Sequence, residues 1–121
     1  MAMNVKQYAF VRGSDPVLDG EFAAAKAYGN IRPGETVIFW KSGLRWCAIS
    51  VAEIQRIHRR LEPVVRRMCC GGRSYYVEWL VLILQSGEEL MLRIGDDMKK
   101  DAEALFAHLQ ERYPDIQYGK V

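Results

Sequence analysis

The stretch Tyr75–Leu84, YYVEWLVLIL, carries the strongest strand signal in the chain. Aromatic and β-branched residues favour strands, and the second half of this stretch is apolar on both faces. Ser86 and Gly87 then form a turn into Glu89–Ile94, ELMLRI, where apolar and polar residues alternate. The two stretches predict a central strand covered on both sides, followed by a strand with one buried face.

A long amphipathic helix is predicted after these strands. Its apolar stripe recurs every three or four residues and consists of Met98, Ala102, Leu105, Leu109 and Tyr113, with Phe106 beside it. We expect Asp96 and Asp97 to cap the start of this helix and Pro114 to end it. Asp115–Lys120 is expected to be a short extended tail.

Upstream, Thr36–Trp40 and Leu44–Val51 are rich in β-branched and aromatic residues and are separated by a three-residue turn, so they predict a hairpin. Val64–Met68 is a further run of this type. Residues 54–61 fit either a helical stripe or a strand, and their periodicity does not decide between the two. Pro63 is expected to end either element.

The N-terminal third predicts one strand and one helix. Gln7–Val11 reads as a strand or extended arm. Asp15 followed by Pro16 is typical of a helix start, and we expect a helix within residues 16–28 that ends at Gly29 and Asn30.

Together these elements predict a single α+β domain over residues 1–121, because a chain of this length builds one core. A run of antiparallel strands followed by one amphipathic helix indicates a bent sheet or incomplete barrel that the helix covers. We expect Leu105, Phe106 and Leu109 to point into its core, and the tryptophans Trp40, Trp46 and Trp79 to pack there.

The segments GETVIFWKSGLRWCAISVAEI, RMCC, YYVEWLVLILQSGEELMLRI and RYPDIQYG resemble small, uncharacterised bacterial proteins with a pleckstrin-homology-like (PH-like) domain. The resemblance covers roughly residues 34–119. It implies a partly open PH-like barrel over residues 34–121, capped by the C-terminal helix, with residues 1–33 as an extra strand and helix. It also favours a strand for residues 54–61. It implies no function, because one fold serves many functions.

Charge is unevenly distributed along the chain. Residues 56–73 contain six arginines and a single acid, Glu62, in a protein whose net charge is only +2. Since guanidinium groups bind phosphate and carboxylate well, five of them are candidates for an anion-binding site: Arg56, Arg60, Arg66, Arg67 and Arg73. The alternative is that these arginines pair with acids elsewhere in the fold or on another chain, such as Glu88, Glu89, Asp96 or Asp97.

The strand interpretation of residues 54–61 carries a specific expectation about the arginines. Because side chains alternate along a strand, Arg56, His58 and Arg60 would share one face and Arg59 would lie on the other. His58 and His108 are expected at the surface or at its boundary.

Several classes of protein do not fit the sequence. It lacks the signatures of hydrolases, nucleotide-binding loops and zinc proteases, so we expect no enzyme, no cofactor and no catalytic residue. Cys47, Cys69 and Cys70 lack metal-binding spacing and are expected to be reduced thiols. Neither a membrane span nor a secretion signal is visible, and the pI near 8.5 does not favour nucleic acid.

We therefore expect a non-enzymatic, cytoplasmic binding or interaction module. Its partner would be a protein or peptide, with self-association left open, that docks along an exposed strand edge or beside the helix. The alternative is binding of a phosphate, headgroup or nucleic acid through the arginine-rich segment 56–73.

Overall fold

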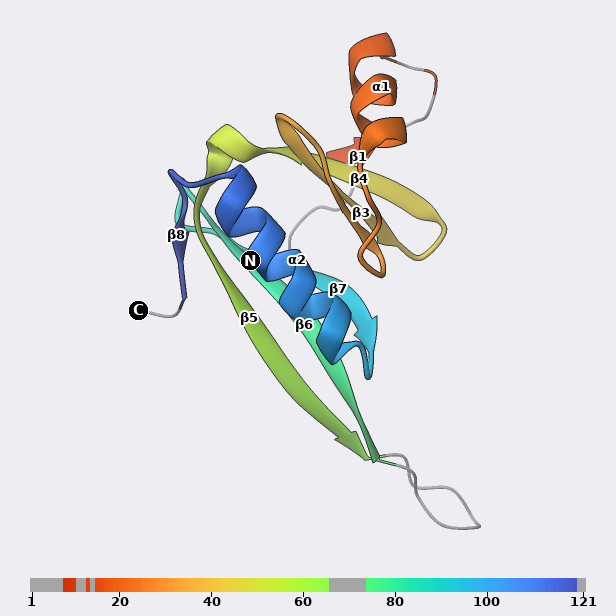
Figure 1. The fold of residues 1–121 in the computed structure, drawn as a ribbon, viewed down its shortest axis with the longest axis vertical. Helices are drawn as coiled ribbons and strands as arrows, with labels where there is room; N and C mark the ends of the chain where they lie inside the picture. Colours follow the sequence, from red (N-terminus) through yellow and green to blue (C-terminus); the bar gives the residue numbers. More distant parts are fainter. Residues whose placement is uncertain (1–7, 11–12, 14, 66–73, 120–121) are drawn as a thin grey trace.

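The computed structural model describes residues 8–10, 13, 15–65 and 74–119. Within them the protein is an α+β fold with two four-stranded sheets and two α-helices (Figure 1). This confirms the predicted fold class. No helix of the described part is long and apolar enough to cross a membrane.

The first sheet is antiparallel and has the order β1-β4-β3-β2. Its strands are β1 (Ala9–Phe10), β2 (Ile31–Pro33), β3 (Val37–Ser42) and β4 (Arg45–Ser50). β3 and β4 form the predicted hairpin. β2 was not predicted, because three residues that end in a proline carry almost no strand signal of their own.

The second sheet has the order β7-β6-β5-β8. Its strands are β5 (Ile54–Val65), β6 (Ser74–Leu84), β7 (Glu89–Asp96) and β8 (Gln117–Tyr118). A short 3-10 turn, Val51–Glu53, connects the two sheets. Residues 54–61 are therefore a strand, and residues 66–68 of the predicted run Val64–Met68 lie outside the described residues.

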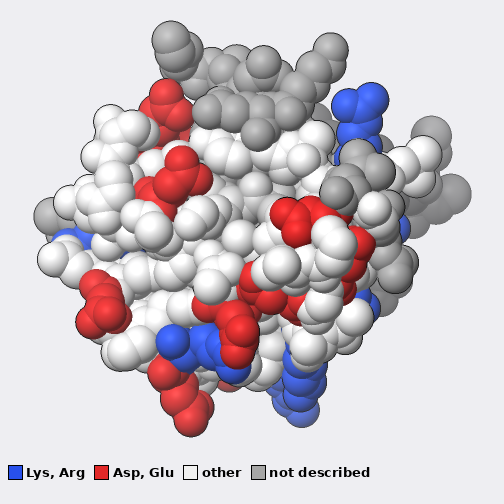
Figure 2. Space-filling view, turned by 90° about the horizontal axis from the view of Figure 1, so that it is seen from above, with Lys and Arg blue, Asp and Glu red and all other residues white. Residues whose placement is uncertain are grey.

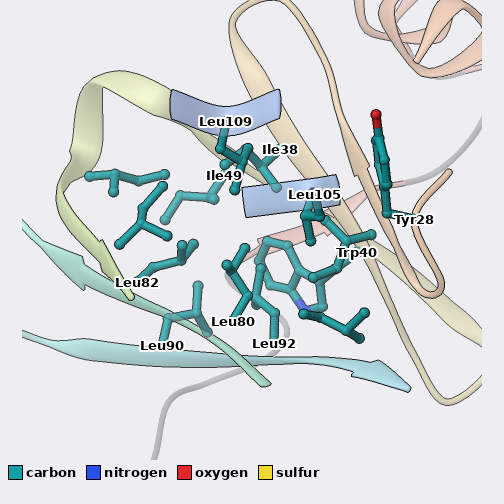
Figure 3. Close-up of a cluster of buried hydrophobic side chains, with 14 of the residues drawn as sticks. Tyr28, Ile38, Trp40, Ile49, Leu80, Leu82, Leu90, Leu92, Leu105 and Leu109 are labelled. Atoms are coloured by element: carbon teal, nitrogen blue, oxygen red, sulfur yellow. The ribbon is translucent and has the colours of Figure 1, made fainter. Parts of the chain in front are cut away.

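Helix α2 (Lys99–Arg112) packs over the second sheet, and its buried side chains complete a core shared by both sheets (Figures 1 and 3). Leu105 and Leu109 are fully buried there, as predicted. They meet Ile38 and Trp40 of the first sheet and Leu80 of the second within one hydrophobic cluster. Phe106 is only partly buried and stacks edge-on against Tyr118.

Helix α1 (Pro16–Ala24) covers the opposite face of the first sheet. Phe22 of α1 meets Phe10 of β1 and Phe39 of β3 in a second, smaller cluster. Trp46 is half-buried against this cluster rather than in the main core. The first sheet is thus buried on both faces.

The two sheets are open and do not close into a barrel, which corrects the expectation of one continuous bent sheet. They touch where the turn after α1 meets β7: the Asn30 N–H donates to the Ile94 carbonyl at 3.1 Å. Gly29 makes this approach possible, because it has φ +61 and any Cβ there would collide with the Ile94 carbonyl. β8 also departs from the antiparallel expectation, since it pairs parallel to β5.

The predicted cap of the C-terminal helix is wrong. The N-cap is Met98, which provides no capping hydrogen bond from its side chain. Asp96 is the last residue of β7, and Asp97 has φ +52 and accepts a hydrogen bond from the Tyr76 N–H at 3.0 Å. The Asp97 carboxylate therefore fixes the connection to β6 instead of the helix terminus.

The first helix starts where the sequence predicts, with Asp15 as N-cap and Pro16 in its first turn, but it ends at Ala24. Tyr28 is buried in the main core and exchanges two backbone hydrogen bonds with Ile31. This tight turn needs extended backbone before it, so tertiary packing overrides the helical signal of residues 25–28.

Pro63 does not end β5, which also corrects the prediction. The strand continues to Val65 and keeps a regular register with β6 on either side of the proline. A proline is tolerated in a strand where its nitrogen faces away from the neighbouring strand. Pro63 therefore identifies β5 as an edge strand over this stretch.

Candidate functional site

Strand β5 distributes its basic residues over both faces of the second sheet. Arg56, His58 and Arg60 lie on the face away from the core, opposite Ile83, Val81 and Trp79 of β6. Arg59 lies on the core face, opposite the buried Leu80. This confirms the alternation predicted for the strand interpretation.

Arg59 has a structural role. Its guanidinium lies 3.4 Å from a carboxylate oxygen of Glu78, whose side chain is only 3% exposed. Glu78 is the buried charged residue of the described core, so Arg59 supplies the charge that compensates it. This pair was not among those predicted, because Glu78 lies within the most apolar strand of the chain.

The Arg56 side chain is hydrogen-bonded to the C-terminal tail. Its guanidinium donates to the Gly119 carbonyl at 3.0 Å and to the Gln117 side-chain oxygen at 2.6 Å. These bonds fasten β8 to the upper part of β5.

Arg60 is the exposed arginine of the strand, and no ion pair joins it to any residue in the described ranges. It lies four residues from Arg56, which is about 13 Å along a strand. The Arg56 guanidinium is already bonded to Gly119 and Gln117, so Arg60 is the described candidate whose charge stays available to an anion. The other three candidates, Arg66, Arg67 and Arg73, lie outside the described residues.

The acids that were expected to pair with the arginine-rich segment have other roles. Asp96 pairs with Arg93 of its own strand, and Asp97 binds the Tyr76 backbone. Glu88 and Glu89 are exposed and form no ion pair within the described part of the chain. Of the three arginines of this segment that the structure describes, Arg59 forms an ion pair, with Glu78.

The backbone of β5 forms an open sheet edge. β8 pairs with it only at Arg56 and Ile57, and the Gly119 N–H donates to the Ile57 carbonyl at 2.9 Å. Backbone groups of successive residues point to alternate sides of a strand, so those of Arg59, Leu61 and Pro63 also point away from β6. The His58 ring nitrogen lies 3.5 Å from the Arg59 carbonyl, and no described strand or turn pairs with these backbone groups.

Figure 1 shows this lower half of β5 as the free border of the sheet, extending beyond both α2 and β8. Two large apolar side chains are exposed on the α2 side of this extension: Leu61 is 53% exposed and Tyr76 is 51% exposed. Leu61 lies opposite Glu78, and Tyr76 lies opposite Pro63. Leu61 and Tyr76 thus form an exposed apolar group together with Pro63.

The end of the molecule where α1 lies carries many acidic side chains. Seen from the end where α1 lies, the described surface shows acidic side chains spread more widely than Lys and Arg (Figure 2). Helix α1 itself contributes Asp19 and Glu21 and no basic residue. The basic side chains of β5 lie on a strand that runs away from this end (Figure 1).

Other parts of the described structure offer fewer groups that are free to bind a ligand. A hollow of about 600 Å³ lies between α1 and the end of α2, but its two carboxylates already have partners. Glu21 accepts hydrogen bonds from the Thr36 N–H and hydroxyl, and Glu35 lies 3.9 Å from the Arg112 guanidinium. His108 is half-buried with its ring 5.6 Å from that of Tyr28. The described residues contain no cluster suited to a metal ion.

The described cysteine is an inert one. Cys47 is fully buried in the core, and burial raises the pKa of its thiol, only partly offset by Arg45. A thiol that stays protonated and inaccessible is a poor nucleophile. Cys69 and Cys70 lie outside the described residues.

The sequence and the structure single out different groups of the same strand. The sequence singled out arginine side chains, whereas the structure shows backbone groups of Arg59 and Leu61 that pair with no described strand. The signal that could have found this edge is Pro63, because a proline inside a strand is confined to sheet borders.

Comparison with known proteins adds no relative to this picture. A scan against protein-family models and searches of curated proteins and of solved structures found no match for the chain.

Proposed function

We propose that the protein is a non-enzymatic interaction module that binds an extended segment of a partner protein along the open edge of β5. The observation that supports this proposal is that no strand in the described part of the chain pairs with the outward backbone groups of Arg59, Leu61 and Pro63. A strand edge of this kind provides hydrogen bonds to an added strand whatever its sequence. We keep the PH-like assignment of residues 34–121 as part of this proposal.

The other border of the same sheet is less suited to docking. β7 has an irregular register beside Glu78, and the turn at Asn30 bonds to its Ile94 carbonyl. Bulges and covering turns are means by which proteins protect sheet edges. Between Arg56 and Val65 the pairing of β5 with β6 is regular, and no turn in the described ranges bonds to its outer edge beyond Ile57.

The edge offers a site of defined length. Arg59 and Leu61 each present an N–H and a carbonyl, whereas Pro63 presents a carbonyl only. β8 closes the site on one side at Ile57, and the missing N–H of Pro63 weakens pairing on the other. A bound segment would thus pair over about five residues, which is about 17 Å of extended chain.

The test uses Leu61→Pro, which removes one edge N–H without touching the ladder to β6. Because Pro63 occupies the same orientation, we expect this variant to fold. Leu61→Ala is the matched control, since it shortens the side chain but keeps the N–H. A phage-displayed library of random 12-residue peptides is selected on the wild-type protein, and the enriched peptides are measured by fluorescence anisotropy.

We expect enriched peptides to bind the wild type and Leu61→Ala but to lose binding to Leu61→Pro. Amide exchange at Arg59 and Leu61 in the wild-type protein, followed by NMR, should slow on peptide addition. Equal binding to Leu61→Pro together with unchanged exchange would contradict the proposal. Binding of heparin that both variants share would favour the arginine-based anion function instead.

A further inference from the structure

We infer that the segment docked on β5 alternates acidic and apolar residues. This inference rests on the proposed function and names the chemistry of the partner. An added strand shares the two faces of its neighbour, so each of its side chains meets either the outer or the core-side row of β5. The two rows of β5 differ in chemistry.

The outer row is basic where the edge is open. His58 and Arg60 point to this face, and their neighbours across the sheet, Val81 and Trp79, are apolar. Glu62 lies on the same face two residues further along and forms no ion pair with Arg60. The positive charge of Arg60 is therefore available to an acid of the added strand.

The core-side row is apolar at the same place. Leu61 and Pro63 are exposed there, next to Tyr76, because the strand extends past the cover of α2. Arg59 also belongs to this row, but its guanidinium is turned to Glu78. Exposed apolar side chains grouped in this way mark contact surfaces.

The pairing of an added strand with β5 determines which residue types that strand needs at each position. Residues opposite His58 and Arg60 would face outward and be acidic, whereas the residue opposite Leu61 would face the core side and be apolar. The period of two holds whether the added strand runs parallel or antiparallel, because only the faces decide it.

A second copy of β5 meets this pattern at one position only. Antiparallel pairing of β5 with itself, centred on Leu61, would place Arg60 of one strand beside Glu62 of the other, but it would offer no acid to His58. The described β5 has one acid, Glu62, against three arginines and a histidine. Charge complementarity thus favours an acidic partner over a dimer through this edge.

The inference is tested with three synthetic nine-residue peptides. The first alternates Glu and Val, the second has the same composition with the Glu residues in one block, and the third alternates Lys and Val. Affinities are measured by fluorescence anisotropy for the wild type, Arg60→Glu and Leu61→Pro. The oligomeric state of each protein is checked by light scattering.

We expect the alternating Glu peptide to bind the wild type about fivefold more tightly than the block peptide. This difference in affinity corresponds to the interaction free energy of one or two cross-strand pairs. Arg60→Glu should transfer the preference to the alternating Lys peptide. Leu61→Pro should weaken every peptide that binds the edge.

Failure of this inference can be told apart from failure of the proposed function. Equal affinity for the alternating and block peptides, or no response to Arg60→Glu, overturns the inference, and loss of that binding in Leu61→Pro still supports docking at the edge. Binding that Leu61→Pro leaves unchanged overturns both. A dimer that Leu61→Pro dissociates would replace the acidic partner with a second copy.

Discussion

At the scale of single residues, neighbouring arginines have opposite roles. Arg59 compensates the buried carboxylate of Glu78, whereas Arg60, one residue later, points to the outer face. The alternation of side chains along a strand is the whole cause of this difference. It makes the two positions a natural pair for comparison.

Arg59→Ala should reduce the free energy of unfolding by about 3 kcal/mol, because it leaves the buried carboxyl group of Glu78 without its partner. Arg60→Ala should change it by less than about 0.5 kcal/mol, as is usual for an exposed side chain. Urea unfolding followed by circular dichroism measures both. Similar values for the two variants would show that the pair with Glu78 does not stabilise the fold.

The raised pKa of Tyr113 predicts how the stability of the fold changes at alkaline pH. Burial raises the pKa of its phenol to about 12, and the hydroxyl donates a hydrogen bond to the Gly34 carbonyl. The unfolded chain loses this proton near pH 10 and the folded protein near pH 12. The stabilisation is therefore complete below pH 10 and is lost as the pH rises to 12, at up to about 1.4 kcal/mol per pH unit.

Tyr113→Phe removes this group and should flatten the decline of stability between pH 10 and 12, although it lowers stability at pH 7 by about 1 kcal/mol through the lost hydrogen bond. Some decline remains, because partial burial also raises the pKa of Tyr118 to about 12. Urea midpoints at pH 8 to 12 provide the measurement. Parallel curves for wild type and variant would contradict the assignment.

At the scale of elements, helix α2 joins the two sheets. Its Leu109 is fully buried and contributes to the same cluster as Ile38 of the first sheet and Leu82 of the second. Gln110, the next residue, is exposed. The helix thus presents one face to both sheets and another to solvent.

Leu109→Ala should cost about 2–5 kcal/mol of stability, because the cavity would lie where helix and sheets meet. Gln110→Ala is the control and should change stability by less than about 0.5 kcal/mol. Thermal and urea unfolding of the two variants are compared. A cost for Leu109→Ala no larger than that for Gln110→Ala would contradict the packing of α2.

At the scale of the whole molecule, the two sheets share one core and should unfold together. Trp40 and Trp46 report on the first sheet, and Trp79 reports on the second. A single cooperative transition is usual for a domain of this size with one core.

Two variants test this cooperativity: Trp40→Phe with Trp46→Phe leaves Trp79 as the reporter, and Trp79→Phe leaves the other two. Within each variant, the urea midpoint from fluorescence should equal that from far-UV circular dichroism. A fluorescence midpoint that differs from the circular dichroism midpoint would show that the sheets unfold separately.

Local patterns in the sequence predicted much of the fold. The apolar run of β6, the alternation in β7 and the stripe of α2 are periodic over many residues, so they indicate their elements without reference to the rest of the chain. Asp15 and Pro16 also indicated the start of α1, because helix capping involves only residues next to each other in the chain. The alternation of Arg56, Arg59 and Arg60 followed once residues 54–61 were taken as a strand.

The α+β class, the main strands and the helix follow from the sequence, because burial periodicity is a local property. The folded chain was needed to show that the strands form two open sheets, that Asp97 binds β6 rather than capping α2, and that β5 passes through Pro63. It also decided which border of the sheet stays open. These features depend on which segments lie side by side, and pairing between distant segments leaves no periodic trace in either of them.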